Sequence, residues 1–185
     1  YYDDTTKIET STKATNDYKI IDNNGISLKA KWNKNQYTVT LDTNKQSAMS
    51  NNITLPGSDT YQMTFDESNN NIVQVPSVTG WTFDGWYTSD NVKVYNSDGS
   101  YNRDVLTYFD KDGEWVYTDN ITLYAHWSQK KYTLTLDLNR QTNMSSTPAF
   151  SSTHSNTYEM TYDSATNNTI VKGVVTGWTF DGWLS

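Results

Sequence analysis

The segment FDKDGEW holds the densest group of acidic side chains in the chain, with Asp110, Asp112 and Glu114 close together. Closely spaced carboxylates suit a hard cation, which takes several oxygen ligands, and a facing pair of acids suits cleavage of a glycosidic bond. The full ligand spacing of a calcium loop is missing here, and a glycosidase pair needs a cleft that a small module hardly provides. A solvated turn is the favoured interpretation, and a cation site is the alternative.

Other catalytic chemistry has weaker support in the sequence. The two histidines, His126 and His154, have no counterpart in the internal repeat described below, so no serine–histidine pair recurs. No glycine loop that could cradle a phosphate is present. No lysine recurs at an aligned position, as a repeat-wide Lys–Asn cross-link would require. We therefore expect no enzymatic activity and no catalytic, cofactor or metal site.

Tryptophans are the remaining candidates for a binding face, because exposed Trp and Tyr rings can stack on sugars. Most of them recur at alternating strand positions, which favours burial in a core, as does the alignment of Trp115 with Ile20. Core packing is the favoured interpretation, and sugar stacking is the alternative. The recurring pairs are Trp32 and Trp127, Trp81 and Trp178, and Trp86 and Trp183.

An internal repeat covers the whole chain and defines the elements that position these side chains. Four motifs recur, the first two at an offset of 95 (127 − 32) and the last two at 97 (183 − 86), so an insertion lies in the loop that contains His154. They are ISLKAKW at 26–32 and ITLYAHW at 121–127, YTVTLDTN at 37–44 and YTLTLDLN at 132–139, YQMTFD at 61–66 and YEMTYD at 158–163, and GWTFDGW at 80–86 and 177–183.

Each recurring motif predicts a β-strand. Apolar residues alternate with polar ones in 26–32, and Tyr37, Val39 and Leu41 share one face of the next strand. In GWTFDGWY, Trp86 reaches the face of Trp81 and Phe83 if Asp84-Gly85 forms a bulge.

Polar, turn-rich segments connect the predicted strands. Loops are expected at 66–71 and 96–102, and helix is confined to a turn or two around 104–109. The acids that both copies share lie at strand ends or in the proposed bulge, so turn formation explains them without catalysis. These acids are Asp42 and Asp137, Asp66 and Asp163, and Asp84 and Asp181.

Composition favours mainly β structure and disfavours several kinds of partner. The 185 residues are 35% hydrophobic, with 7 Trp, 14 Tyr and 5 Phe, which fits one or two small aromatic cores. A net charge of -7 disfavours binding to nucleic acid or to anionic lipid. No apolar run approaches the roughly 20 residues that span a bilayer. The absence of cysteine excludes a disulfide scaffold and leaves the compartment open.

Three motifs, in this order, resemble the Listeria-Bacteroides repeat, also called the internalin B-type B repeat. They are the YTVTL strand at 37–41, the GWTFDGWY signature at 80–87 and the closing LYAHW at 123–127. The family commonly has Asn-Gly-Gly after its first strand, whereas this chain has Asn44-Lys45-Gln46 and Asn139-Arg140-Gln141. A turn that depends on glycine at positive φ is therefore not carried over.

The resemblance implies tandem, small, β-grasp-like modules that are mainly β, or α+β at most. It places a complete module at 33–127, the closing part of a preceding repeat at 1–32 and the opening part of a following repeat at 128–185. It further implies a non-enzymatic, extracellular protein of the bacterial cell surface or wall, acting as a stalk or fibre element. The alternative is an adhesin or carbohydrate-binding module that binds a host protein or glycan through aromatic side chains and loops.

A second frame for the repeat stays open. Trp32 and Tyr37 are separated by four residues, which also suits two strands joined by a hairpin loop. The units would then be 1–88 and 96–185, approximately. Pairing of residues 28–32 with 37–41 would favour this frame.

The 33–127 frame also predicts how the ends are completed. The segment after Trp183 lacks a closing strand, and residues 26–32 have the sequence of one. An open strand edge beside an aromatic core invites the addition of a strand. Two sources remain open, which are a neighbouring repeat of the same chain and an identical chain in a head-to-tail fibre.

Overall fold

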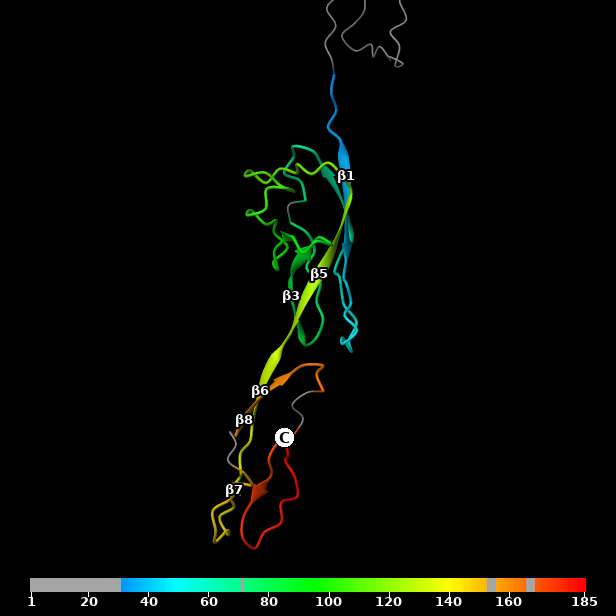
Figure 1. The fold of residues 1–185 in the computed structure, drawn as a ribbon. Coiled ribbons are helices and arrows are strands. Elements are labelled where there is room, and N and C mark those ends of the chain that lie inside the picture. The colour runs from blue at the N-terminus through cyan, green and yellow to red at the C-terminus, as the bar shows by residue number, and fades with distance from the viewer. Residues whose placement is uncertain (1–30, 71, 153–155, 166–168) are drawn as a thin grey trace, which may run out of the picture. The chain divides into compact units, whose positions relative to one another are not determined.

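Residues 36–129 contribute a five-stranded mixed sheet to the fold (Figure 1). The computed structural model describes residues 31–185 except 71, 153–155 and 166–168. The strands of the described part are β1 (Gln36–Asp42), β2 (Thr60–Thr64), β3 (Trp81–Tyr87), β4 (Lys93–Tyr95), β5 (Ile121–Gln129), β6 (Lys131–Thr135), β7 (Ala149–Phe150), β8 (Thr157–Thr161) and β9 (Gly173–Val174). This confirms a mainly β chain.

The central strand of this sheet is β5, and the strand order is β2-β1-β5-β3-β4. β1 runs parallel to β5, with Val39 opposite Ile121, while β3 runs antiparallel to β5 on the other side. Parallel strands cannot be joined by a tight hairpin. The connection from β1 to β5 is therefore long. It contains β2, β3 and β4 of the same sheet, and β5 begins only at Ile121.

The buried core lies on one face of the sheet and beneath the segment that precedes β5. Val39 and Leu41 are buried as the alternation predicts, and they pack in one cluster with Tyr108, Phe109 and Trp115. The helix expected around 104–109 is wrong, since this segment forms turns. Pairing with a later segment explains the difference, because the N–H of Val116 donates to the carbonyl of Tyr108 at 3.0 Å and Phe109 forms an antiparallel bridge with Trp115.

The bulge predicted at Asp84-Gly85 is confirmed. The register of β3 against β5 shifts between Phe83 and Gly85, and Gly85 has a φ of 137°. Because of this shift Trp81, Phe83 and Trp86 are all buried. A β-carbon at Gly85 would lie 2.6 Å from the carbonyl oxygen of Tyr95 on β4.

Gly85→Ala is expected to lower the free energy of unfolding by about 1–3 kcal/mol, because the backbone is strained for any other residue. The contact with the Tyr95 carbonyl oxygen adds to this cost. Gly182→Ala is the matched control, since Gly182 has a φ of 144° but nothing within 4 Å of the added carbon. Urea unfolding of both variants measures the difference, and equal losses would show that the β4 contact contributes nothing.

Residues 130–185 repeat much of this local geometry. The antiparallel β6–β8 pair places Lys131 opposite Thr161, which matches the pairing of Gln36 with Thr64 in β1 and β2. The backbone N–H of Asn44 donates to Asp42 Oδ1 at 2.7 Å, and Asn139 donates to Asp137 Oδ1 at 2.8 Å. We call residues 33–127 the first set and 128–185 the second set.

The turn after the first strand of each set has an asparagine in the left-handed conformation. Asn44 has a φ of 48° and Asn139 a φ of 42°. Asparagine tolerates this left-handed conformation better than most residues, and the hydrogen bond to the preceding aspartate supports the turn.

The rival hairpin frame concerns residues that lie largely outside the described part, since residues 28–30 are among those not described. Within the described part, β1 is paired on one side with β2 and on the other with β5. β5 and β6, separated only by Lys130, belong to different sheets. Both frames stay predictions, and so does the β-grasp assignment.

Candidate functional site

The acidic segment 110–114 forms a turn in which the carboxylates bind backbone and lysine. Asp110 Oδ1 accepts hydrogen bonds from the backbone N–H groups of Asp112 and Glu114, both at 2.9 Å. Lys111 Nζ pairs with the Asp112 carboxylate. Among the described residues, no group of three His, Cys, Asp or Glu side chains is placed to hold a metal ion. These contacts fit a solvated turn.

Among the described residues, no hydrogen bond joins His126 to a serine or another nucleophile. His126 stacks on Tyr87 with ring centroids 3.9 Å apart. His154 lies outside the described residues.

Three tryptophans of the first set are buried as predicted, while Trp127 is only partly buried. Trp32, the counterpart of Trp127, is 88% exposed, so the prediction of core packing is wrong for it. Trp86 and Trp115 are fully buried and Trp81 is 8% exposed, so core packing is confirmed for them. Trp178, the counterpart of Trp81, is 44% exposed, and the prediction of a buried core position is wrong there. The difference lies in what covers each ring.

Trp81 is covered by the end of the β6–β8 pair. Tyr162 packs against a small cluster of Met49, Val78 and Trp81. The Tyr162 ring also lies on Gly80, so a β-carbon added there would fall 1.9 Å from Tyr162 Cδ1. Gly80 has a φ of 80°, which favours glycine independently of this contact.

Hydrogen bonds to Tyr162 and Asp163 complete the contact. Asp163 accepts hydrogen bonds from Ser50 Oγ at 2.8 Å, from Ser50 N at 3.1 Å and from Trp81 Nε1 at 3.2 Å. Asn51 Nδ2 donates to the Tyr162 hydroxyl at 2.9 Å. We call the contact of Tyr162 and Asp163 with Gly80, Trp81 and Ser50 the junction.

Backbone hydrogen bonds fix where the β6–β8 pair begins relative to β3. The N–H of Lys130 donates to the carbonyl of Gly80 at 2.9 Å, and the N–H of Tyr162 donates to the carbonyl of Lys130 at 2.9 Å. Gln129 Nε2, at the end of β5, donates to the carbonyl of Tyr162 at 2.9 Å. These bonds place Tyr162 over Gly80 without a flexible linker between the two sets.

Sequence reasoning missed the junction, because it assigned Asp163 to turn formation alone. Asp163 does have a positive φ of 51°, as Asp66 does at 50°. Its partners Ser50 and Trp81 are 113 and 82 residues away along the chain, so no local spacing could indicate them. The recurrence of an aromatic residue followed by Asp in both copies, Phe65-Asp66 and Tyr162-Asp163, was the available signal.

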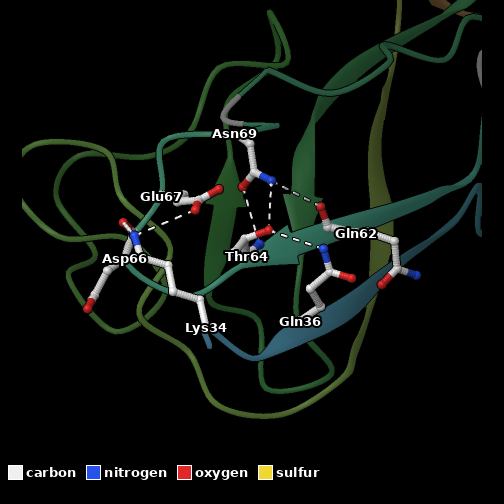
Figure 2. Close-up of polar contacts among 7 residues, drawn as sticks. All are labelled: Lys34, Gln36, Gln62, Thr64, Asp66, Glu67 and Asn69. Carbon is white, nitrogen blue, oxygen red and sulfur yellow. Dashed lines mark hydrogen bonds and ion pairs between the residues drawn. The ribbon is translucent and has the colours of Figure 1, made fainter. Parts of the chain in front are cut away.

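Asp66, the counterpart of Asp163, lies in a polar cluster near the start of β1 (Figure 2). Lys34 Nζ donates to the carbonyl of Asp66 and lies 3.6 Å from Glu67 Oε1. Gln36 and Asn69 both donate to Thr64 Oγ1. The bonds drawn in Figure 2 between the labelled residues reach the carbonyl of Asp66 and not its carboxylate.

Asp163 makes the junction sensitive to acid. The hydrogen bonds from the Ser50 side chain, the Ser50 backbone and Trp81 hold the pKa of Asp163 below its ordinary value of 3.8. A carboxylate whose pKa is lowered by folding stabilises the protein above its unfolded pKa, and this contribution is lost as the pH falls through the folded value.

Asp163→Asn is therefore expected to remove a pH-dependent part of the stability that the unmodified chain loses below about pH 4. Urea midpoints at pH 7 and pH 3 measure it, and the loss between the two should be smaller in the variant. Identical pH dependence in the variant and the unmodified chain would contradict the role of Asp163.

No helix of the described residues is long and apolar enough to cross a membrane. No family model, no curated protein and no solved structure matches this chain.

Proposed function

We propose that this chain is a structural, non-enzymatic repeat segment of a bacterial cell-surface protein, in which each set is locked to the next to form an extracellular stalk or fibre element. The junction is the observation that carries the proposal. Tyr162 and Asp163 of the second set cover Gly80 and Trp81 of the first set, so residues of both sets contribute to the burial of Trp81.

The physical argument concerns stiffness. A stalk must keep its units in a fixed direction, and a short interdomain linker without packing contacts allows units to reorient. Here one residue, Lys130, separates β5 from β6, and its backbone bonds to both sets. Apolar contact at Trp81 and hydrogen bonds at Asp163 then resist bending at this point. The resemblance to a surface-protein repeat supports the extracellular location.

The second candidate function is binding of a glycan or host protein. Its support is that Trp178 and Phe180 are exposed in the described part, at 44% and 38%. Both residues correspond to positions that are buried in the first set, Trp81 and Phe83. An uncovered junction and an open strand position explain their exposure without a ligand.

Nuclear magnetic relaxation of the full chain tests the structural function, at a concentration where the chain is monomeric. One rotational correlation time is expected for the backbone amides of β1, β3 and β5 and for those of the β6–β8 pair. Two independent correlation times would contradict the proposal. Binding of the chain to a glycan array, lost in a Trp178→Ala variant, would favour the second candidate instead.

A further inference from the structure

The junction has two sides, and the internal repeat allows each side to be compared with its counterpart in the other set. We call the residues of the first set that accept the contact the receiving surface, and they are Met49, Ser50, Gly80 and Trp81. All of them recur unchanged in the second set, as Met144, Ser145, Gly177 and Trp178. The receiving surface is therefore common to both sets and does not by itself distinguish one neighbouring set from another.

The residues that dock on this surface, Tyr162 and its following aspartate, also have close counterparts in the first set, Phe65 and Asp66. We call each such aromatic residue and aspartate a docking pair. The backbone N–H of Tyr162 donates to the carbonyl of Lys130 at 2.9 Å, and that of Phe65 donates to the carbonyl of Asn35, the counterpart of Lys130, at 3.0 Å. The aspartates of both pairs are left-handed, with φ of 50° and 51°. The two docking pairs thus share their backbone geometry and differ by one atom, the phenol oxygen.

One side chain of the first set contacts that oxygen. Asn51 directly follows Ser50, and its Nδ2 donates to the Tyr162 hydroxyl at 2.9 Å. The same nitrogen also donates to Ser50 Oγ at 3.3 Å. An asparagine amide carries two hydrogens, so the two bonds do not compete. Asn51 and Tyr162 are both half-buried, so water replaces the bond between them only in part if the hydroxyl is lost.

Unlike the receiving surface, Asn51 does not recur in the second set. Its counterpart is Ser146. A serine oxygen is bonded directly to the β-carbon, whereas Nδ2 of asparagine lies one atom further out. A serine at this position is therefore too short to make the 2.9 Å contact that Asn51 makes with the hydroxyl. The two sets offer the same receiving surface with a different polar neighbour beside it.

We infer that Asn51 makes the first set selective for a neighbouring set whose docking pair begins with tyrosine rather than phenylalanine. A docking pair of the Phe65 type keeps the ring and the carboxylate but leaves a hydrogen of Asn51 without its acceptor. A site that hydrogen-bonds a hydroxyl discriminates against the analogue that lacks it, because the polar group of the site then loses its partner. This inference rests on the proposed function and adds that neighbouring sets are matched, so their order along the stalk is specified.

Exchange of the Trp81 indole hydrogen with water tests the inference in the full chain. This hydrogen is bonded to Asp163 when the docking pair is in place, so its exchange reports opening of the junction. The variants are Tyr162→Phe, Asn51→Ser and the two together, and each substitution introduces the residue that the other copy has at that position. Tyr162→Phe is expected to speed the exchange about threefold to tenfold, the size of one ordinary hydrogen bond. In the presence of Asn51→Ser, the same substitution should change the exchange by less than about twofold.

Tyr158→Phe is the matched control, because it removes a hydroxyl from β8 that is bonded outside the junction. The Tyr158 hydroxyl accepts a hydrogen bond from the backbone N–H of Val171 at 3.2 Å. This variant should leave the Trp81 exchange unchanged. The inference is overturned if Tyr162→Phe speeds the exchange no more than Tyr158→Phe does, or if its effect is the same with and without Asn51.

The proposed function has a separate readout, because the rotational correlation times are measured on the unmodified chain. One shared correlation time, together with a Trp81 exchange rate that does not depend on the Tyr162 hydroxyl, would leave the structural function standing and remove the selectivity. Two correlation times would contradict the structural function, and the coupling between Asn51 and Tyr162 is measured independently of that result.

Discussion

Trp86→Ala is expected to lower the free energy of unfolding by about 3–5 kcal/mol, a large part of the stability of a small domain. The indole is fully buried and packs edge-on against Phe83 at 5.3 Å. Its Nε1 donates to the carbonyl of Gln74 at 2.9 Å, so the alanine variant also leaves that acceptor without its partner. Chemical unfolding measures the loss.

Trp183→Ala is the matched control for this variant. Trp183 has the same local contacts, with Phe180 at 5.1 Å and a hydrogen bond to the carbonyl of Val171 at 3.0 Å. Because Trp183 is only partly buried, its removal should cost much less. Equal losses in the two variants would contradict a core centred on the first set.

Gly80→Ala is expected to have the second largest effect, because it combines two costs. A residue with a β-carbon at a φ of 80° is strained by about 1–3 kcal/mol. The added carbon would also fall 1.9 Å from Tyr162 Cδ1, and forcing extra volume into packed side chains costs about 1–3 kcal/mol more. The Tyr162 ring has to leave Gly80, so the junction should weaken together with the overall stability.

Gly177→Ala isolates the backbone cost, since Gly177 has a φ of 81° and no neighbour within 4 Å of the added carbon. The difference between the two variants, measured by urea unfolding of the dilute chain, reports the Tyr162 contact. Tyr162→Ala in the Gly80→Ala background should then add little. A Gly80→Ala loss no larger than that of Gly177→Ala would show that Tyr162 does not pack there.

Much of the first set could be predicted because its signals are local. Alternation in 37–41 predicts the burial of Val39 and Leu41, and the count of residues in GWTFDGW requires a bulge if both tryptophans are buried. Both features follow from which side of a strand a residue faces. No contact with another part of the chain is needed to infer them.

The remaining features depend on contacts between distant residues. Tyr108, Phe109 and Trp115 are buried in a segment of turns, where no periodicity marks them as core. Identical motifs also led to the expectation that Trp178 is buried like Trp81. Burial of Trp81 depends on Tyr162 and Asp163 of the next set, so the same residues take different environments when the neighbour differs.

The indole N–H signal of Trp81 in a two-dimensional nitrogen–proton spectrum tests the junction most directly. At a dilution where the chain is monomeric, Asp163→Asn and Tyr162→Ala are each expected to shift this signal and to speed its exchange with water, because both remove a group that contacts Trp81. The Trp178 signal in the same spectrum should stay in place. A Trp81 signal unmoved by both substitutions, exchanging as fast as that of Trp178, would contradict the account.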